Sequence, residues 1–259
     1  GKAFRNEITP GNFIFRTIEF EQMEHQWFCK EGTDQEYYAE YKKRAWQFLL
    51  DLGFKEEHLR FHDHDKLAHY AKAACDIQYD FPMGWSELNG IHNRTDYDLS
   101  RHQEYSGKSM TYVDPVTQER YIPYVIEYSI GADRLMLAAL SEAYDEETLE
   151  NGEVRNVMRF HPAIAAYKAA VLPLQKGLAP QAKELLQKLK KHFLVTYDEA
   201  GSIGKRYRRQ DEIGTPYCLT VDFDTLQDGT VTVRDRDTME QVRMTADEVV
   251  AFLAEKCSF

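Results

Sequence analysis

The chain has 259 residues, 43% of them hydrophobic, so it can bury one large core or two moderate ones. Its formal net charge of −11 argues at first sight against a nucleic-acid partner, yet all of the net acidity lies in residues 1–159, and the remaining residues carry equal numbers of basic and acidic side chains. No apolar run is long enough to span a membrane, and the N-terminus resembles neither a signal peptide nor a transit peptide, so we expect a cytoplasmic protein.

The first part of the chain carries two strand signals and one strong helix signal. A turn at Pro10-Gly11 precedes stretches rich in Phe and Ile, and we predict strands over residues 13–16 and 19–28. Thr33 and Glu36 match a capping box, after which apolar residues recur at helical spacing until Gly53. The predicted helix presents the apolar residues Tyr37, Tyr41, Ala45, Phe48, Leu49 and Leu52.

Further elements are predicted toward the middle of the chain. Residues 66–74 predict a second, shorter helix, and residues 124–130 predict a buried strand that leads into a helix beginning near Gly131. Residues 144–152 are acidic and polar, with little periodicity. We therefore place a domain boundary near residue 155.

Beyond this boundary, strands and helices alternate in the order typical of an α/β domain with a mixed sheet. The predicted strands cover residues 169–172, 194–197 and 217–223, with a hairpin over residues 230–244. The predicted helices cover residues 180–193 and a closing segment capped by Thr245, with Glu248 three positions on. The fold class of the whole chain is therefore α/β (α+β).

Two arginines and several carboxylates fall on neighbouring segments near the N-terminus. The forked guanidinium groups of Arg5 and Arg16 suit phosphate oxygens, Glu7 can accept a hydrogen bond from an adenine amino group, and Phe20 offers a face for stacking. Such a ribbon can hold a nucleotide. The alternative is a solvated hairpin of alternating charges, since exposed charged strands are common.

A second candidate site lies where the predicted strand over residues 124–130 runs into a helix at Gly131-Ala132-Asp133-Arg134. The helix N-terminal amides, a glycine that permits close approach and the Arg134 side chain would together stabilise a triphosphate. The alternative is a plain strand-to-helix junction, because this four-residue pattern alone is a weak signal.

These two candidate sites resemble signature motifs of class II aminoacyl-tRNA synthetases. Residues 4–24 resemble the second motif, and residues 131–135 resemble the third. Between them, residues 84–91 (GWSELNGI) and 93–99 (NRTDYDL) are similar to a stretch particular to glycyl-tRNA synthetases of the homodimeric type. The resemblance covers essentially the whole chain. It implies a partial catalytic core, built on an antiparallel sheet, over residues 1–155.

The resemblance implies roles in an ATP site. Arg5 would hold the α-phosphate and the glycine carboxylate, and Arg134 would hold the γ-phosphate, so these two are the expected catalytic residues. Glu7 would meet the adenine amino group, Phe20 would stack on adenine, and Arg16 would lie over the β- and γ-phosphates. The implied ATP-binding residues are Arg5, Asn6, Glu7, Phe15, Arg16, Phe20, Glu87, Leu88, Gly131 and Arg134. The implied cofactors are ATP and Mg²⁺, with Glu87 as the candidate magnesium ligand.

The same resemblance implies a glycine pocket next to the ATP site. Its residues would be Phe20, Gln22, Glu24, Glu127, Ser129 and Gly131. Glycine has no side chain to grip, so its selection must come from charge partners for its ammonium group and from walls that exclude any Cβ.

After residue 155 the chain resembles the α/β anticodon-binding domain shared by several class II synthetases, most of all over residues 201–216. The implied tRNA-binding residues are Lys205, Arg206, Tyr207, Arg208 and Arg209. Their basic side chains would contact phosphates, and the tyrosine would stack on an unpaired base. The alternatives are a solvated cationic segment and a phosphate-binding loop. The loop is disfavoured because GSIGK lacks the required spacing and the following Ser or Thr.

A zinc site is not predicted. His62, His64 and His69 alternate in part with aspartates, but no glycyl-specific role supports metal binding there, and such runs at a strand end are usually solvated. The four cysteines are scattered and form no CxxC pair, so they predict neither a disulfide framework nor a thiolate zinc site.

The activity implied by the resemblance is that of a glycine–tRNA ligase, which activates glycine with ATP and transfers it to tRNA(Gly). Enzymes of this type begin well before the second motif, with a first motif that builds the dimer interface, whereas this chain opens almost directly on the second. We expect the full-length family member to be a homodimer, and we expect catalysis and dimerisation to depend on residues outside this chain. The alternative is a non-catalytic, synthetase-like protein that binds tRNA or another nucleic acid. The expected domains are residues 1–155 and 156–259.

Overall fold

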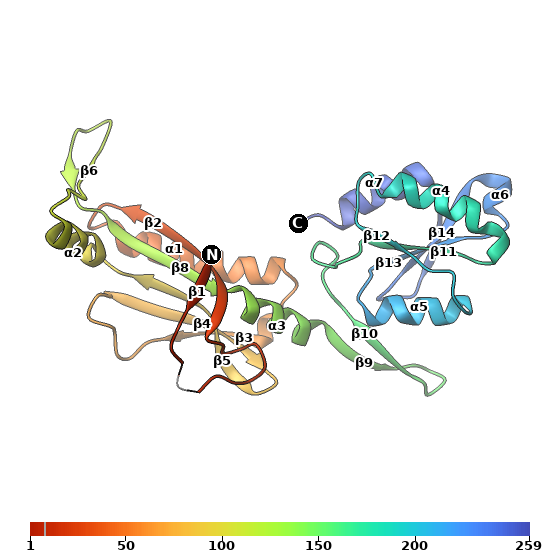
Figure 1. The fold of residues 1–259 in the computed structure, drawn as a ribbon, viewed down its shortest axis with the longest axis horizontal. Coiled ribbons are helices and arrows are strands. Elements are labelled where there is room, and N and C mark those ends of the chain that lie inside the picture. The colour runs from red at the N-terminus through yellow and green to blue at the C-terminus, as the bar shows by residue number, and fades with distance from the viewer. Residues whose placement is uncertain (8) are drawn as a thin grey trace. The chain divides into compact units, whose positions relative to one another are not determined.

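The computed structural model describes residues 1–7 and 9–259. They form two compact units, Gly1–Ser141 and Glu142–Phe259 (Figure 1). The predicted domain boundary near residue 155 falls inside a strand of the second unit and stays a prediction. None of the helices in the described ranges has the length and apolarity that a membrane span requires.

The first unit is built on a six-stranded sheet in the order β1-β2-β8-β5-β4-β3, in which every neighbouring pair is antiparallel. This confirms the antiparallel sheet predicted for the first part. The strands are β1 (Lys2–Phe4), β2 (Glu19–Cys29), β3 (Leu59–Asp63), β4 (Ala73–Phe81), β5 (Gly84–Asn93) and β8 (Tyr124–Gly131), with a separate pair of β6 (Tyr112–Val113) and β7 (Arg120–Tyr121). The helices are α1 (Asp34–Asp51), the 3₁₀ helix η1 (Glu56–His58), α2 (Tyr97–Ser106) and α3 (Ala132–Ala143).

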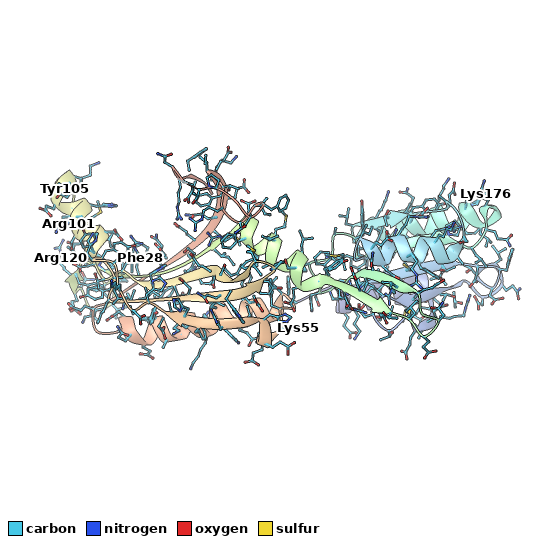
Figure 2. All side chains as sticks on the ribbon, turned by 90° about the horizontal axis from the view of Figure 1, so that it is seen from below. Phe28, Lys55, Arg101, Tyr105, Arg120 and Lys176 are labelled. Atoms are coloured by element: carbon cyan, nitrogen blue, oxygen red, sulfur yellow. The ribbon has the colours of Figure 1, made fainter. Side chains whose placement is uncertain are left out.

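Helix α1 covers one face of this sheet and leaves the other face to the N-terminal segment (Figure 2). On the covered face the Trp27 ring of β2 lies 5.5 Å from Tyr37 and 6.2 Å from Tyr41, both on α1. Leu49 of α1 is fully buried in the same core, and so are Ile77, Leu88, Ile91 and Ile126. Because side chains alternate along a strand, the neighbours of Trp27 on β2 point to the opposite face.

The start of α1 is held by a buried carboxylate. Asp34 accepts hydrogen bonds from Lys72 Nζ (2.8 Å) and Asn93 Nδ2 (2.6 Å), which tie the helix to the sheet. Burial alone would raise the pKa of Asp34, but these two hydrogen bonds outweigh it and keep that pKa below the usual value. The predicted capping box is wrong, because the Thr33 hydroxyl donates to the Lys30 carbonyl and makes no cap hydrogen bond.

Two other local predictions are wrong. Residues 13–16 form part of a tight turn closed by a bridge between Gly11 and Arg16, and the positive φ angles of Asn12 and Phe13 (53° and 55°) are incompatible with a strand. Residues 66–74 contain no helix, and β4 begins at Ala73, where the alternating pattern that extends to Phe81 takes over. The predicted strand over residues 19–28 and the helix from Tyr37 onward are confirmed.

The second unit is an α/β domain with a mixed five-stranded sheet in the order β12-β11-β13-β14-β15, as predicted. Strand β11 pairs in parallel with β12 and β13, and the last three strands are antiparallel. The strands are β11 (Ala169–Pro173), β12 (Val195–Tyr197), β13 (Tyr217–Val221), β14 (Thr230–Asp235) and β15 (Gln241–Thr245). The helices are η2 (Lys176–Leu178), α4 (Ala179–Leu189), α5 (Ile203–Glu212), α6 (Thr225–Asp228) and α7 (Ala246–Lys256).

Helices cover both faces of this sheet, which explains why β11 and β13 are buried over their whole length (Figure 1). Ala169 and Val171 face α4 and α7, whereas Ala170 and Leu172 face α5. The capping box predicted for the closing helix is present at Thr245.

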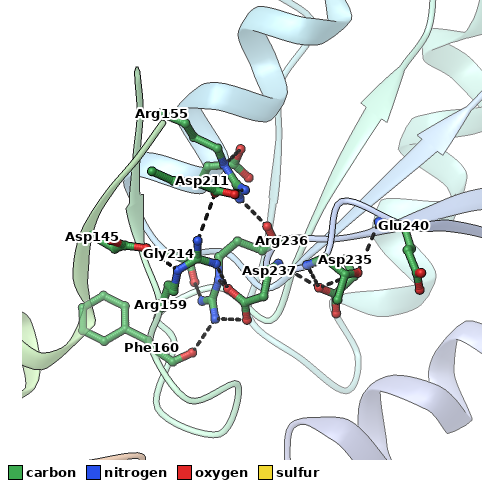
Figure 3. Close-up of polar contacts among 12 residues, drawn as sticks. Asp145, Arg155, Arg159, Phe160, Asp211, Gly214, Asp235, Arg236, Asp237 and Glu240 are labelled. Carbon is green, nitrogen blue, oxygen red and sulfur yellow. Dashed lines mark hydrogen bonds and ion pairs between the residues drawn. The ribbon is translucent and has the colours of Figure 1, made fainter. Parts of the chain in front are cut away.

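A hairpin of β9 (Tyr144–Thr148) and β10 (Val154–Met158) occupies the stretch whose first part was predicted to be an irregular polar segment. A network of buried ion pairs fastens it to the mixed sheet (Figure 3). Arg155 is fully buried and donates from Nε to Asp211 (3.0 Å) and from Nη1 to Glu147 (2.8 Å). Arg234 donates to both oxygens of Asp211, at 2.9 and 3.2 Å, so one carboxylate joins β10, α5 and β14.

The same network fixes the chain that follows the hairpin. Arg236 donates to the backbone carbonyls of Phe160 (2.8 Å) and Gly214 (2.9 Å). Figure 3 shows the contact with Phe160. Gly214 has a φ of +79°, and a Cβ there would lie 2.5 Å from the Phe160 ring. Only glycine fits this position without a shift of the ring.

We predict that Asp211→Asn lowers the stability of the second unit by about 3–5 kcal/mol, because it leaves the buried guanidinium group of Arg234 without a countercharge and that of Arg155 with Glu147 alone. Amide hydrogen exchange of β11 and β13 measures this loss within the whole chain. Asp247→Asn is the matched control, because Asp247 is 91% exposed and pairs with Lys188 only at the surface. Equal effects of the two substitutions would contradict the structural role of the network.

Candidate functional site

A polar hollow lies on the sheet face that α1 leaves open, and it encloses about 590 Å³ of space that includes open solvent. It combines most of the residues that the sequence analysis assigned to ATP and glycine. The described residues that line it are Arg5, Glu7, Ile14, Phe15, Arg16, Thr17, Phe20, Glu21, Gln22, Glu87, Leu88, Ser129, Ile130, Gly131, Asp133 and Arg134. Asn6, Glu24 and Glu127 lie outside this set.

Arg134 joins three segments that are far apart in the sequence. Its Nε donates to the Phe15 carbonyl (3.0 Å). Its Nη1 donates to the Glu87 carbonyl (3.1 Å) and also lies 3.3 Å from the Glu87 carboxylate. The guanidinium carbon lies 4.2 Å from the centre of the Phe15 ring. The first turn of α3, the turn at residues 11–16 and the strand β5 therefore meet at one cation.

Two further cations lie at the rim of the hollow. The guanidinium of Arg5 lies 5.1 Å from the centre of the Phe20 ring. Arg16 Nη1 lies 3.1 Å from the Glu7 carboxylate, and its side chain is 44% exposed. Solvent-exposed guanidinium groups around a concave surface attract anions, and planar forks are suited to phosphate or carboxylate.

The strand register places the remaining predicted glycine-site residues in adjacent rows of the open face. Gln22 pairs with Gly131, and Glu24 pairs with Ser129, which in turn pairs with Gly90 of β5. In the next row Gln26, Glu127 and His92 lie side by side. Directly paired residues share a face, so these rows lie on the same face as Phe20.

The structure also brings to Glu127 residues to which sequence reasoning gave no role. Arg94 Nη1 donates to the Glu127 carboxylate at 3.3 Å, and Gln26 Nε2 donates to it at 3.3 Å. His92 Nδ1 lies 3.5 Å from Glu127 Oε1, too long for a strong hydrogen bond. The alternation of side chains along β5 could have indicated that His92 belongs to the site, since it places Gly90 and His92 on one face. Gln26 follows Gln22 and Glu24 at the same period on β2.

The Glu127 carboxylate is held in its charged form. Contact with His92 is the largest cause that lowers its pKa, burial opposes this effect, and the positive charge of Arg94 reinforces it. Arg94 is itself paired with Asp98, at 2.7 and 3.3 Å. A buried, ionised carboxylate beside a cavity is suited to bind a cation such as a substrate ammonium group.

A metal site made by side chains alone is not found in residues 1–7 and 9–259, where no three His, Cys, Asp or Glu side chains gather in a suitable group. The histidines considered for zinc contact other partners. His64 lies 2.8 Å from Asp76, and His69 lies 3.1 Å from the Tyr97 hydroxyl. Glu87, the candidate magnesium ligand, lies 3.3 Å from Arg134.

The basic run of the second unit lies on helix α5, and its members face different surroundings. Arg206 is buried and donates to the carbonyls of Gly201 and Pro173. The Tyr207 hydroxyl lies 2.7 Å from Thr220 Oγ1, and Arg209 pairs with Asp198 at 2.9 Å. Lys205, another of the five predicted tRNA-binding residues, lies at the start of the helix and is exposed.

Arg208 is partly exposed, 3.6 Å from Asp211. The role of the whole run in tRNA binding stays a prediction, and Arg206 and Tyr207 are poorly oriented for it because their polar groups are bonded inside the unit.

Comparison with protein families assigns both parts of the chain. Residues 1–143 match the family described as "tRNA synthetase class II core domain (G, H, P, S and T)", and residues 168–256 match the family described as "Anticodon binding domain".

Similar proteins carry a consistent name. The chain is 62% identical to a glycine–tRNA ligase of Clostridium kluyveri (strain ATCC 8527), 61% to one of Clostridium perfringens (strain 13) and 61% to one of Geobacillus kaustophilus (strain HTA426). Each match covers 100% of this chain but only 56–57% of the relative, so the chain spans just over half the length of these curated relatives.

A solved structure described as the RNA binding domain of threonyl-tRNA synthetase from Cryptosporidium parvum Iowa II superposes with a TM-score of 0.74 at 18% identity. The superposition covers 99% of this chain and 69% of the solved chain, and it is evidence for the fold only.

We predict that Arg134→Met loosens the turn at residues 11–16. Loss of the hydrogen bonds to the Phe15 and Glu87 carbonyls should speed hydrogen exchange of the Phe15 amide roughly tenfold or more, which corresponds to about 1–3 kcal/mol of local stability. Arg101→Met, which removes an exposed cation paired with Glu104 on α2, is the control and should leave this amide unchanged. Unaltered exchange in Arg134→Met would show that the turn forms without this contact.

Proposed function

The chain belongs to the tRNA synthetase class II core family, and we propose that it carries the ATP- and glycine-handling part of a glycine–tRNA ligase, followed by a domain that binds tRNA(Gly). The observation that supports this most is the hollow, in which Arg5, Arg16 and Arg134 lie around a sheet face that carries Ser129, with Glu127 in the next row outside the hollow. Three cations suit a triphosphate, and a buried carboxylate suits an ammonium group.

In the proposed first step an oxygen of the glycine carboxylate attacks the α-phosphorus of ATP. The bond from this phosphorus to the bridging oxygen breaks, and pyrophosphate leaves with that electron pair. Arg5 would hold the α-phosphate and the glycine carboxylate together, which reduces the entropic cost of bringing them into line. Arg16 and Arg134 would stabilise the charge that develops on the departing phosphates.

In the proposed second step the terminal ribose hydroxyl of the tRNA attacks the carbonyl carbon of glycyl-adenylate, and AMP leaves. No covalent intermediate with the protein is required. Phe20 would stack on the adenine base, and Glu7 would accept from its amino group. The contact of Arg5 with the Phe20 ring would bring the base and the α-phosphate to adjacent positions.

Selection of glycine would rest on the rows of β2, β8 and β5. Glu127 and Glu24 would attract the ammonium group, while Ser129 and Gly131 would border the space where a larger amino acid carries its side chain. A single extra methyl group in a pocket changes binding by only about 1–3 kcal/mol, so a rigid wall is needed for strong rejection of alanine. The sheet backbone supplies such rigidity.

Magnesium would enter this site with ATP. Mg²⁺ usually binds through one or two carboxylates, several waters and substrate phosphates, so the Glu87 carboxylate fits this mode. The ion would neutralise phosphate charge. Glu87 would be held toward the hollow by its contact with Arg134, 3.3 Å away.

Three further features belong to the same proposal. tRNA would contact the second unit through exposed cations near the start of α5. The longer protein would act as a homodimer, as the resemblance implies. The cytoplasm is its proposed location.

The first test is glycine-dependent exchange of pyrophosphate into ATP by the longer protein that carries this chain, because we expect catalysis to depend on residues outside it, with alanine and serine as competing substrates. We predict exchange with glycine alone and a loss of at least about 100-fold in Arg5→Ala, because the charged group that would hold the two reactants in line is removed. Binding of tRNA should stay within about twofold, since that site lies on another unit.

Lys2→Ala is the matched control for Arg5→Ala. Lys2 is three positions away on the same segment, but it pairs with Glu19 outside the hollow and should tolerate the change. Equal exchange with alanine would refute the assignment to glycine. Binding of tRNA without any exchange would instead favour a non-catalytic, synthetase-like binding protein.

We also predict that Lys205→Ala weakens tRNA binding and reduces the slope of log affinity against log salt by about 1, the change expected for one lost phosphate contact. The measurement is a filter-binding or fluorescence titration at several salt concentrations. Lys256→Ala, at the end of α7, is the control cation of the same unit. An unchanged salt slope in Lys205→Ala would exclude a phosphate contact at this position.

A further inference from the structure

We propose that His92 makes glycine binding sensitive to pH, because its protonated ring and the glycine ammonium group compete for the carboxylate of Glu127. This inference rests on the proposed function. It assigns a role to a side chain that is not itself a ligand of ATP or glycine in that proposal.

The position of the His92 ring is set by the strand. His92 lies two residues beyond Gly90 on β5, on the same face, and its ring folds back over that glycine. A Cβ built on Gly90 would lie 2.6 Å from Cε1 of the ring. The glycine therefore leaves room for the ring to reach across to β8, where Nδ1 lies 3.5 Å from Glu127 Oε1.

The Nδ1 atom is buried and makes no hydrogen bond with any part of the chain that the structure describes. The Glu127 carboxylate, 3.5 Å away, is an acceptor that a protonated Nδ1 can reach. A neutral ring at this distance leaves most of the negative charge of the carboxylate available to a ligand. A protonated ring would pair with it as a salt bridge.

The other charged groups around His92 are paired with neighbours, so few of them could produce a pH dependence of glycine binding. On the β4 side, Asp76 is paired with His64 at 2.8 Å, and the His64 ring lies 6.3 Å from that of His92. Beyond the end of β5, Arg94 is paired with Asp98 and stays charged at all relevant pH values. On β2, Glu24 accepts from Gln22 at 2.5 Å.

The linkage has a definite sign. When the pH falls through the range in which histidine changes charge, protonated His92 occupies Glu127, and glycine must displace that contact to bind. Glycine affinity should therefore fall on acidification. By reciprocity, bound glycine should lower the pH at which the His92 ring titrates.

The test uses the whole chain with glycine as the ligand and two readouts. Calorimetry measures glycine affinity between about pH 7.5 and pH 5.5, where we expect a fall of roughly threefold or more. NMR of the histidine rings, assigned by loss of the signal in His92→Asn, measures the titration midpoint of His92 with and without glycine. Glu127→Gln should lower this midpoint in the absence of glycine.

The variants separate a specific contact from a general effect of pH. His92→Asn should bind glycine with an affinity that changes little over this range. His64→Asn, which removes the neighbouring ring, is the matched control and should keep the pH dependence. Far-UV circular dichroism checks that both variants fold.

The outcomes are distinct. Glycine affinity that falls equally in the native chain and in His92→Asn would overturn this inference and leave the proposed function standing. The same holds if glycine binds but the His92 midpoint does not move. Absence of glycine binding at every pH, with intact folding, would overturn the proposed function and this inference with it.

Discussion

The pairing register of β2, β8 and β5 is the constraint on which the candidate site depends. Because side chains alternate along a strand, a fixed register decides that Glu24, Ser129 and Gly90 share one face while Trp27 and Ile126 lie on the opposite face, which α1 covers. A slip by one residue would exchange these two sets. The apolar face under α1 therefore specifies the polar face as well, since the core can form only in the register that places the carboxylates on the open face.

A second constraint acts in the other unit, where apolar burial is supplemented by charge. Asp211 is fully buried and joins β10, α5 and β14 through two arginines. A buried ion pair often adds little net stability, but it is strongly directional. It specifies that the β9–β10 hairpin packs in one orientation, whereas exchangeable apolar contacts would permit several.

Much of the fold was predictable from local pattern, and the exceptions have physical causes. The aromatic and β-branched residues of β2 and β8 and the helical spacing after Tyr37 are local signals, which the sequence records directly. The turn at residues 11–16 is instead contacted by Arg134, more than a hundred residues away, and the end of the segment 66–74 pairs with β5 as the start of an interior strand. The hollow was recognisable from its motifs, but the surroundings of Glu127 required the pairing of β5 with β8.

The burial of Arg206 affects how natural variation in the basic run should be interpreted. Its guanidinium closes the carboxyl end of β11 by donating to the Pro173 carbonyl, and it also holds the loop at Gly201. Loss of this side chain would leave buried carbonyls unpaired, so the chain would unfold more often and be degraded more readily in the cell. A variant here would reduce the amount of folded protein without removing an exposed cation of α5.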